Sequence, residues 1–430
     1  MSATSTDRLR RRFLLAAGGA VLLPRARLAL ATGPQRRVVV LGAGWGGLAA
    51  ARALRRQLPD AEVVVVDRAA RFFSLPQSTA WLVGRDDHGP PEHDLAAAAR
   101  RGGYRFVQSE VTSVDRRRRT VATSAGMLRY DWLVVAPGIR EDTLPWVDGD
   151  PEAAAHLARD FSAGFADADG ARALKARLEA FAGGEVVVSI PAGPARCPPA
   201  PYERVLALAW WFGQRRLKTT ITVLDAGGGI AGFRQAFEDQ FPETIRFMPR
   251  TAIRRVDPAS RRVLTDFDEL RFDQALLAAP QRAGALAGML GLLAPGADGR
   301  DGHWAAVEPL TLRSRADERV FVVGDAAGEA SPLFGHYPKT GHMAARQGAI
   351  AAAAIAAAAR GDEAEPTLPD SVCFVHHSLE PPELTRIATR YRIRGDGEIV
   401  QEVDQRRINQ PRGEAQAWAR EMLRDALGLL

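Results

Sequence analysis

Three glycines and one aspartate near the start of the chain have the types and spacing of a dinucleotide-binding site. Gly42, Gly44 and Gly47 form a G-x-G-x-x-G pattern directly after the strand-forming run at residues 37–41. In this pattern the first glycine permits a tight turn, the second lets the backbone approach a pyrophosphate, and the third lets a helix pack on its strand. Asp67 follows twenty residues after Gly47, where a carboxylate would bind a ribose hydroxyl. A glycine turn of purely structural use is the alternative, but the order of strand, helix, strand and acid favours a nucleotide site.

A second set of reactive residues comprises Cys197, Cys373 and Glu203. The two cysteines are the only ones in the chain. In an oxidising compartment they can form a disulfide with each other, although their sequence separation does not show that they meet, and a purely structural bridge is the alternative. Glu203 lies six residues after Cys197 and is a candidate for proton transfer. Its alternative role is an ion pair with Arg204.

The elements that must position these residues indicate an α/β fold with two Rossmann-like halves. A helix is expected over residues 48–58, and strands over 62–66 and 130–138. The run at residues 185–190 resembles the first strand but opens onto PAGPARCPP instead of spaced glycines. Prolines remove the backbone N–H donors that an anion needs, so we expect this second half to lack a nicotinamide site.

The first 31 residues have the pattern of a twin-arginine export signal. Arg10 and Arg11 precede an apolar run at residues 13–23, and Ala29-Leu30-Ala31 provides a small-residue cleavage site. A basic first helix is the alternative. The apolar run is too short to span a bilayer. Export by this route predicts a periplasmic protein that folds before transport.

Charge argues against nucleic acid as a partner. Residues 1–31 hold six arginines and one aspartate, so their removal leaves 51 basic and 50 acidic side chains. The remainder is nearly neutral and has no arginine run interleaved with aromatic residues, as nucleic-acid binding would require.

Six short motifs, taken together, resemble the flavoprotein subunit of flavocytochrome c sulfide dehydrogenase. The most specific is RCPPAPYER at residues 196–204, and the resemblance covers most of residues 35–430. The others, in family order, are GAGWGG at 42–47, VVAPG at 134–138, APQRAG at 279–284, VVGDA at 322–326 and YPKTG at 337–341.

The resemblance implies a glutathione-reductase-like fold that binds FAD, with a redox-active disulfide between Cys197 and Cys373 beside the flavin ring. Family members attach FAD covalently through a cysteine in the segment that corresponds to residues 72–79, where this chain has FFSLPQST with Leu75 near that position. We therefore expect non-covalent FAD. The implied cofactor-binding residues are Gly42, Gly44, Trp45, Gly46, Gly47, Asp67, Val111, Ala136, Pro137, Gly138, Gly324, Asp325, Lys339, Thr340 and Gly341.

Lys339 is unusual because the chain has three lysines and 54 arginines. At the start of the long helix expected from about residue 337 to 360, its charge would favour a negatively charged reduced flavin. A solvated surface lysine is the alternative.

His376 and His377 follow Cys373 closely, but no third ligand has suitable spacing, so we expect packing or surface roles and no metal site.

The resemblance, together with the export signal, implies a periplasmic FAD-dependent sulfide dehydrogenase that oxidises sulfide to sulfur or polysulfide and passes electrons to a c-type cytochrome. The chain lacks C-x-x-C-H, so the cytochrome must be a separate polypeptide. The alternatives are a sulfide:quinone oxidoreductase and a flavoprotein accessory to a thiol-dependent sulfur-oxidation complex. The expected domains are the signal at 1–31, an FAD domain in two parts at 32–145 and 284–365, a degenerate NAD-type domain at 146–283, and a C-terminal interface domain at 366–430.

Overall fold

The computed structural model describes residues 36–76, 78–85, 91–296 and 301–429. The twin-arginine pattern and the small-residue site at 29–31 lie outside the described residues. Within the described ranges, no helix is both long and apolar enough to cross a bilayer.

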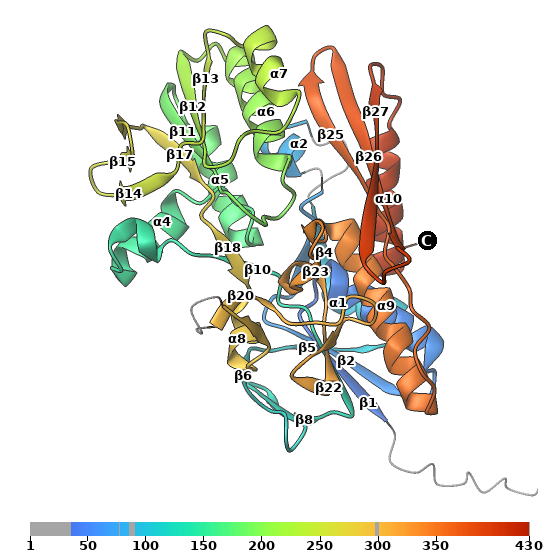
Figure 1. Ribbon diagram of the computed structural model, residues 1–430. Coiled ribbons are helices and arrows are strands. Elements are labelled where there is room, and N and C mark those ends of the chain that lie inside the picture. The colour runs from blue at the N-terminus through green and yellow to red at the C-terminus, as the bar shows by residue number, and fades with distance from the viewer. Residues whose placement is uncertain (1–35, 77, 86–90, 297–300, 430) are drawn as a thin grey trace, which may run out of the picture. The chain divides into compact units, whose positions relative to one another are not determined.

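The first sheet has six strands and collects segments from two distant parts of the chain (Figure 1). β1 and β2 are parallel, with Arg37 opposite Glu62, and the valines of both strands are buried. Continuous apolar strands of this kind are typical of a parallel sheet covered on both faces. The strand order is β21 (Arg313–Ser314), β22 (Asp317–Val322), β9 (Trp132–Val135), β1 (Arg37–Leu41), β2 (Glu62–Asp67) and β5 (Arg105–Gln108), of which only β21 is antiparallel to its neighbour.

Two helices pack closely beside this sheet. α1 (Trp45–Gln57) contacts α9 (Gly341–Arg360), whose buried residues are mostly alanines. A Cβ atom on Gly348 would lie 2.2 Å from the carbonyl oxygen of Gly46, so glycine is required where the two helices meet. This close packing fixes the first residues of both helices next to the carboxyl ends of the strands. α3 (Leu95–Gly102) is buried through Leu95, Ala98 and Ala99 in the same core.

The second sheet is parallel and has four strands, ordered β13 (Ile245–Pro249), β12 (Thr219–Asp225), β11 (Gly184–Ile190) and β17 (Gln274–Leu277). Its core is separate from that of the first sheet and includes the apolar faces of α5 (Ala168–Ala180), α6 (Ala200–Gln214) and α7 (Phe233–Gln240). Two antiparallel strands, β10 (Ile139–Glu141) and β18 (Gln281–Ala283), pair where the chain passes between the two sheets. The α/β fold with two Rossmann-like halves is therefore confirmed.

The C-terminal residues form an antiparallel sheet of β25 (Ser371–Leu379), β26 (Pro382–Ile393) and β27 (Ile399–Ile408), followed by α10 (Glu414–Leu427). β25 contacts α6 and α9, which brings the C-terminal sheet against both halves. The apolar face of α10 is buried against α1 and α3 through Ala426 and Leu427.

The remaining short elements complete the loops around these sheets. They are β3 (Arg71–Phe73), α2 (Ser78–Leu82), β4 (Glu92–Asp94), β6 (Val111–Asp115), β7 (Thr120–Thr123), β8 (Gly126–Arg129), η1 (Leu144–Val147), α4 (Pro151–Asp160), β14 (Ile253–Asp257), β15 (Arg262–Thr265), β16 (Glu269–Arg271), α8 (Ala285–Met289), β19 (Leu293–Pro295), β20 (Asp301–Ala305), η2 (Gly324–Ala326), β23 (Glu329–Ser331) and β24 (Gly335–His336).

Candidate active site

One large cavity of about 1180 Å³ brings together most of the residues that the sequence indicated. It extends from the turn between β1 and α1 to the start of β25. A volume of this order is that of a cofactor or ligand site. The predicted residues that line it are Gly42, Gly44, Trp45, Gly46, Asp67, Val111, Ala136, Pro137, Gly138, Cys197, Glu203, Gly324, Asp325, Thr340, Gly341 and Cys373.

The glycines at 42, 44 and 47 have three different environments. Gly42 has a φ of +100°, and a Cβ atom there would lie 2.2 Å from the carbonyl oxygen of Ala136. A Cβ atom on Gly47 would lie 1.9 Å from the carbonyl oxygen of Gly42. At Gly44 a Cβ atom would meet nothing within 4 Å, because this position faces the cavity. The first and third glycines therefore shape the turn, and the second leaves space for a ligand.

Asp67 links β2 to the glycine turn. Its carboxylate accepts hydrogen bonds from the backbone N–H of Ala43 at 2.7 Å and of Ala69 at 2.8 Å. The side chain also lines the cavity. A carboxylate has about four acceptor positions, so Asp67 retains capacity for a ligand hydroxyl.

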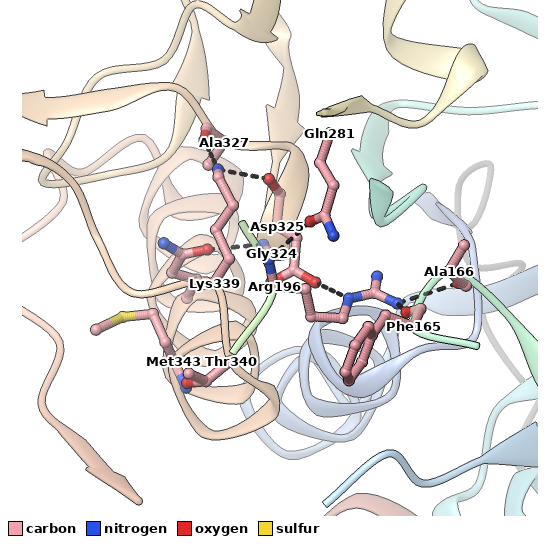
Figure 2. A network of polar contacts seen from close by, with 11 residues as sticks. Phe165, Ala166, Arg196, Gln281, Gly324, Asp325, Ala327, Lys339, Thr340 and Met343 are labelled. Carbon is pink, nitrogen blue, oxygen red and sulfur yellow. Dashed lines mark hydrogen bonds and ion pairs between the residues drawn. The ribbon is translucent and has the colours of Figure 1, made fainter. Parts of the chain in front are cut away.

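Asp325 is a buried acid with only one of its two oxygens engaged. Oδ2 accepts a hydrogen bond from Nε of Arg196 at 2.7 Å, whereas Oδ1 is buried without a partner (Figure 2). The neighbouring Gly324 N–H donates to Oε1 of Gln347 at 2.7 Å, which fixes the turn at η2. Trp45 Nε1, also at the cavity, is a second buried polar atom without a partner. Buried polar groups are normally hydrogen-bonded, so these two atoms at the cavity could each bond a ligand.

Arg196 was missed as a site residue by the sequence reasoning. Besides the bond to Asp325, its guanidinium donates to the backbone carbonyls of Phe165 at 2.6 Å and Ala166 at 3.1 Å (Figure 2). The backbone N–H of Arg196 donates to Oε1 of Gln281 at 2.7 Å. The only signal in the sequence was its place directly before Cys197.

Cys197 and Cys373 lie on the same cavity and are free thiols in this structure. Both side chains are half-buried. Burial raises the pKa of the Cys197 thiol, and Cys373 raises it further. Burial and then Glu203 raise the pKa of Cys373 to about 12. Each thiol is therefore protonated when reduced at neutral pH.

Glu203 lies in the first turn of α6, close to both cysteines. Burial raises the pKa of its carboxyl group, opposed by His376 and by Arg204. Its Oε2 accepts the backbone N–H of His376 at 3.3 Å. The alternative role of an ion pair with Arg204 does not agree with the structure, because the Arg204 guanidinium donates to the Ala163 carbonyl and lies 3.9 Å from the centre of the Phe165 ring.

Lys339 differs from the prediction. Its side chain is 4% exposed, so it is not a solvated lysine, and it does not line the cavity. Nζ donates to the carbonyls of Asp325 at 2.7 Å and Ala327 at 3.0 Å, and it lies 3.6 Å from the centre of the Trp304 ring. The ammonium is therefore held by backbone carbonyls and an aromatic face on the far side of the η2 turn, and we correct the expectation that it contacts the cofactor.

Gly47 also lies outside the cavity lining, since it packs the helix against the turn. His377 packs its ring on Phe233, with centroids 4.7 Å apart. In the described part of the chain, no group of three His, Cys, Asp or Glu side chains is arranged to hold a metal.

A small cavity of about 150 Å³ lies in the second Rossmann-like half, where β11 and β12 end. Asp225 ends β12, the position at which an acid would bind a ribose. Its Oδ2 instead accepts the hydroxyl of Tyr202 at 2.6 Å, and the Tyr202 ring stacks on Phe233 with centroids 5.1 Å apart. Dinucleotide-sized pockets are several-fold larger. An intramolecular contact therefore takes the position of the ribose.

Comparison with known proteins agrees with this geometry. Residues 171–277 match the family model described as the sulfide dehydrogenase (flavocytochrome c) flavoprotein chain, central, and residues 40–105 match an NAD(P)-binding Rossmann-like domain. A sulfide-quinone reductase of Aquifex aeolicus is 27% identical over 237 residues, 52% of this chain and 53% of the relative. A type II NADH:quinone oxidoreductase of Staphylococcus saprophyticus is 30% identical over 114 residues, 25% of this chain and 28% of the relative. The chain thus spans a quarter to a half of the length of these relatives.

Solved structures show the same fold. The sulfide:quinone oxidoreductase of Aquifex aeolicus superposes with a TM-score of 0.72 at 20% identity, covering 91% of this chain and 92% of that one. An NAD-dependent persulfide reductase from A. fulgidus gives 0.61 at 17% identity, covering 90% and 76%. The chain is therefore related in sequence to sulfide-quinone reductase over about half of its length, and it shares the fold of these solved oxidoreductases.

Proposed function

We propose that this protein is an FAD-dependent sulfide dehydrogenase that uses Cys197 and Cys373 as a redox pair and passes electrons to a c-type cytochrome. The observation that carries the proposal is the placement of the chain's two cysteines on the same cavity as the glycine turn and Asp325. A thiol pair in reach of a dinucleotide site is what electron transfer from sulfur to a flavin requires.

The residues present fit FAD. The open position at Gly44 would admit the pyrophosphate, Asp67 would bind the adenosine ribose, and the free Oδ1 of Asp325 would accept a hydroxyl of the ribityl chain. When bound, FAD supplies a two-electron acceptor that can release electrons singly. Leu75 lines the cavity and no cysteine occurs in residues 72–79, so the proposed attachment is non-covalent.

The cysteine pair would bind sulfide by thiol–disulfide exchange. Hydrosulfide attacks one sulfur of the Cys197–Cys373 disulfide: a new S–S bond forms to the substrate sulfur, the bond between the cysteines breaks, and its electron pair leaves on the second cysteine. The departing thiolate takes a proton, and loss of two electrons and two protons from the resulting persulfide and thiol would restore the disulfide and release sulfur at the zero-valent level. Burial disfavours both thiolates, so the substrate supplies the nucleophile.

Glu203 is the proposed proton donor to the departing cysteine. A thiolate in this buried site needs a proton, and the raised pKa of Glu203 keeps a carboxylic acid available near both sulfurs. Once it has given its proton, the carboxylate is stabilised by the N–H of His376.

The C-terminal helix favours a soluble acceptor over a quinone in a membrane. α10 has an apolar face, but that face is buried against α1 and α3. A helix that binds a bilayer surface needs its apolar face free. Together with the proposed export by the twin-arginine route, this supports a periplasmic protein that reduces a cytochrome c. Similarity to sulfide-quinone reductases keeps sulfide:quinone oxidoreductase as the second candidate.

The two candidates are separated by one anaerobic assay. The mature protein is mixed with sulfide and with either a soluble cytochrome c or a soluble ubiquinone analogue, and reduction of each acceptor is followed by absorbance. We expect sulfide-dependent cytochrome reduction that is faster than quinone reduction at equal acceptor concentration. Faster reduction of the quinone would indicate a sulfide:quinone oxidoreductase. Reduction of neither acceptor would favour the role of a flavoprotein accessory to a sulfur-oxidation complex.

A further inference from the structure

The segment at residues 338–342, here called the anchor segment, contacts the backbones that carry both cysteines. It precedes and begins α9. It is itself held firmly: the ammonium of Lys339 binds two carbonyls of the η2 region, and Oγ1 of Thr340 caps α9 by accepting the N–H of Met343 at 3.2 Å (Figure 2). Because α9 packs closely on α1, the anchor segment belongs to the most tightly packed part of the first half.

Cys197 is held by the backbone of the anchor segment. Arg196 and Lys339 form a parallel β-bridge, and the N–H of Cys197 donates to the carbonyl of Lys339 at 2.8 Å. Cys197 has a φ of +46°, in the left-handed region that costs a non-glycine residue free energy unless the surroundings hold it. The bonds of Arg196 to Asp325 and Gln281 supply that support.

Cys373 is held by a side chain of the same segment. The N–H of Val372, directly before Cys373, donates to Nδ1 of His342 at 3.3 Å. β25 begins at Ser371, so this bond fixes the first residues of the strand that carries the second cysteine. The ring of His342 also lies near that of Trp418, with centroids 6.4 Å apart. One segment thus bonds the backbone at or next to both cysteines.

We propose that His342 is a positioning residue, whose Nδ1 holds the backbone at Val372 and Cys373 in place opposite Cys197 and so determines how readily the two thiols form a disulfide. The inference rests on the proposed function only in taking the cysteines as a redox pair. It assigns no contact between His342 and substrate or cofactor.

The imidazole must be neutral at Nδ1 to accept this bond. Burial lowers the pKa of His342, and Arg346 on α9 lowers it further, whereas Asp370 before β25 and Glu421 on α10 act in the opposite direction. Protonation turns Nδ1 into a donor and removes the acceptor for Val372. Acidification below the ordinary histidine range should therefore weaken the hold on Cys373.

The test measures the thiol–disulfide equilibrium of Cys197 and Cys373 in glutathione buffers, by mass spectrometry after alkylation. No sulfide is present, and a selenol catalyst keeps exchange fast below pH 7. The variants are His342→Ala, His342→Asn, whose amide oxygen can replace Nδ1, and the control His156→Ala on the surface of α4. Flavin content and thermal midpoint are recorded for each.

Loss of one backbone hydrogen bond should make the disulfide roughly three- to tenfold easier to reduce in His342→Ala at pH 7. His342→Asn and His156→Ala should stay within about twofold of the parent. The parent disulfide should also become easier to reduce as the pH falls from 7 to 4.5, and that change should be smaller in His342→Asn, where only the titration of Glu203 beside the two cysteines remains. If His342→Ala does not fold, the pH comparison of the parent with His342→Asn decides alone.

An unchanged equilibrium in a folded His342→Ala, or the same pH dependence in His342→Asn and the parent, would overturn the proposal. These outcomes are independent of sulfide oxidation. If the positioning role holds but sulfide does not reduce the flavin, the proposed function fails and this inference remains.

Discussion

At the scale of single residues, burial disfavours the charged form of several ionisable groups at or near the site. Cys197, Cys373 and Glu203 all have raised pKa values, with burial as the first cause. The pKa of Lys339 is lowered, because burial disfavours its ammonium. Neutral forms of the two cysteines and Glu203 are thus favoured at the cavity, which suits a reaction in which charge arrives with the hydrosulfide.

Lys339 gives a prediction on stability and pH. Burial lowers its pKa from 10.5 to about 7, with Arg196 adding to the effect and Asp325 opposing it. Between about pH 7 and 10 the unfolded chain binds a proton that the native protein does not, so this residue makes stability rise with pH. The free energy of unfolding, measured with urea, should rise over this range by up to several kcal/mol more in the parent than in Lys339→Met. Equal slopes in the two proteins would contradict the assignment.

At the scale of elements, the turn between β1 and α1 separates structural from ligand-binding glycines. Gly44→Ala adds a methyl group that meets no protein atom, so the apoprotein should keep its thermal midpoint while flavin per protein falls. Gly47→Ala, the same chemical change three residues on, would place Cβ against the Gly42 carbonyl and should lower the free energy of unfolding by roughly 1–3 kcal/mol or more. Parent-like flavin content in Gly44→Ala would refute the role of this position.

The junction of β11 and α6 predicts that NADH is not a substrate. It contains four prolines, at 191, 194, 198 and 199, and the Tyr202 hydroxyl bonds one oxygen of the Asp225 carboxylate. Backbone N–H donors are needed to hold the pyrophosphate of a dinucleotide there, and the prolines remove them. Anaerobic addition of micromolar NADH should leave the flavin absorbance unchanged over minutes. Rapid bleaching would show that the second half binds a nicotinamide after all.

How far the sequence predicts this site depends on whether the signal is local. The roles of Gly42, Gly44 and Gly47 follow from their spacing, because a turn and a helix start are decided within a few residues. The bonds of Arg196 to Asp325 and of Tyr202 to Asp225 join residues on different elements, and no local pattern encodes them. Lys339 shows where a local pattern fails to predict a side chain. The motif placed Lys339 next to the cavity, but its side chain is oriented by carbonyls and by Trp304, which are distant in the sequence.

At the scale of the whole molecule, two sheets and the C-terminal sheet converge on one cavity, and all of its contacts to FAD are proposed to be non-covalent. Precipitation with acid should unfold the protein and release yellow flavin into the supernatant, since residues 72–79 offer no cysteine for a thioether. A control flavoprotein with covalent FAD should keep its flavin in the pellet. Flavin remaining with this protein's precipitate would contradict the proposed attachment.

The central claim is that Cys197 and Cys373 transfer electrons from sulfide to the flavin, and do not only stabilise the fold. A structural bridge that closes a loop of about 175 residues should contribute on the order of 4–5 kcal/mol, so its removal would first lower the thermal midpoint. A redox pair predicts a different pattern. Cys373→Ser is best compared with the parent by recording flavin content, thermal midpoint and the rate of anaerobic flavin bleaching by sulfide in the same preparations. We expect retained flavin, a folded protein and loss of sulfide-driven bleaching; bleaching of Cys373→Ser at near the parent rate would contradict the redox role.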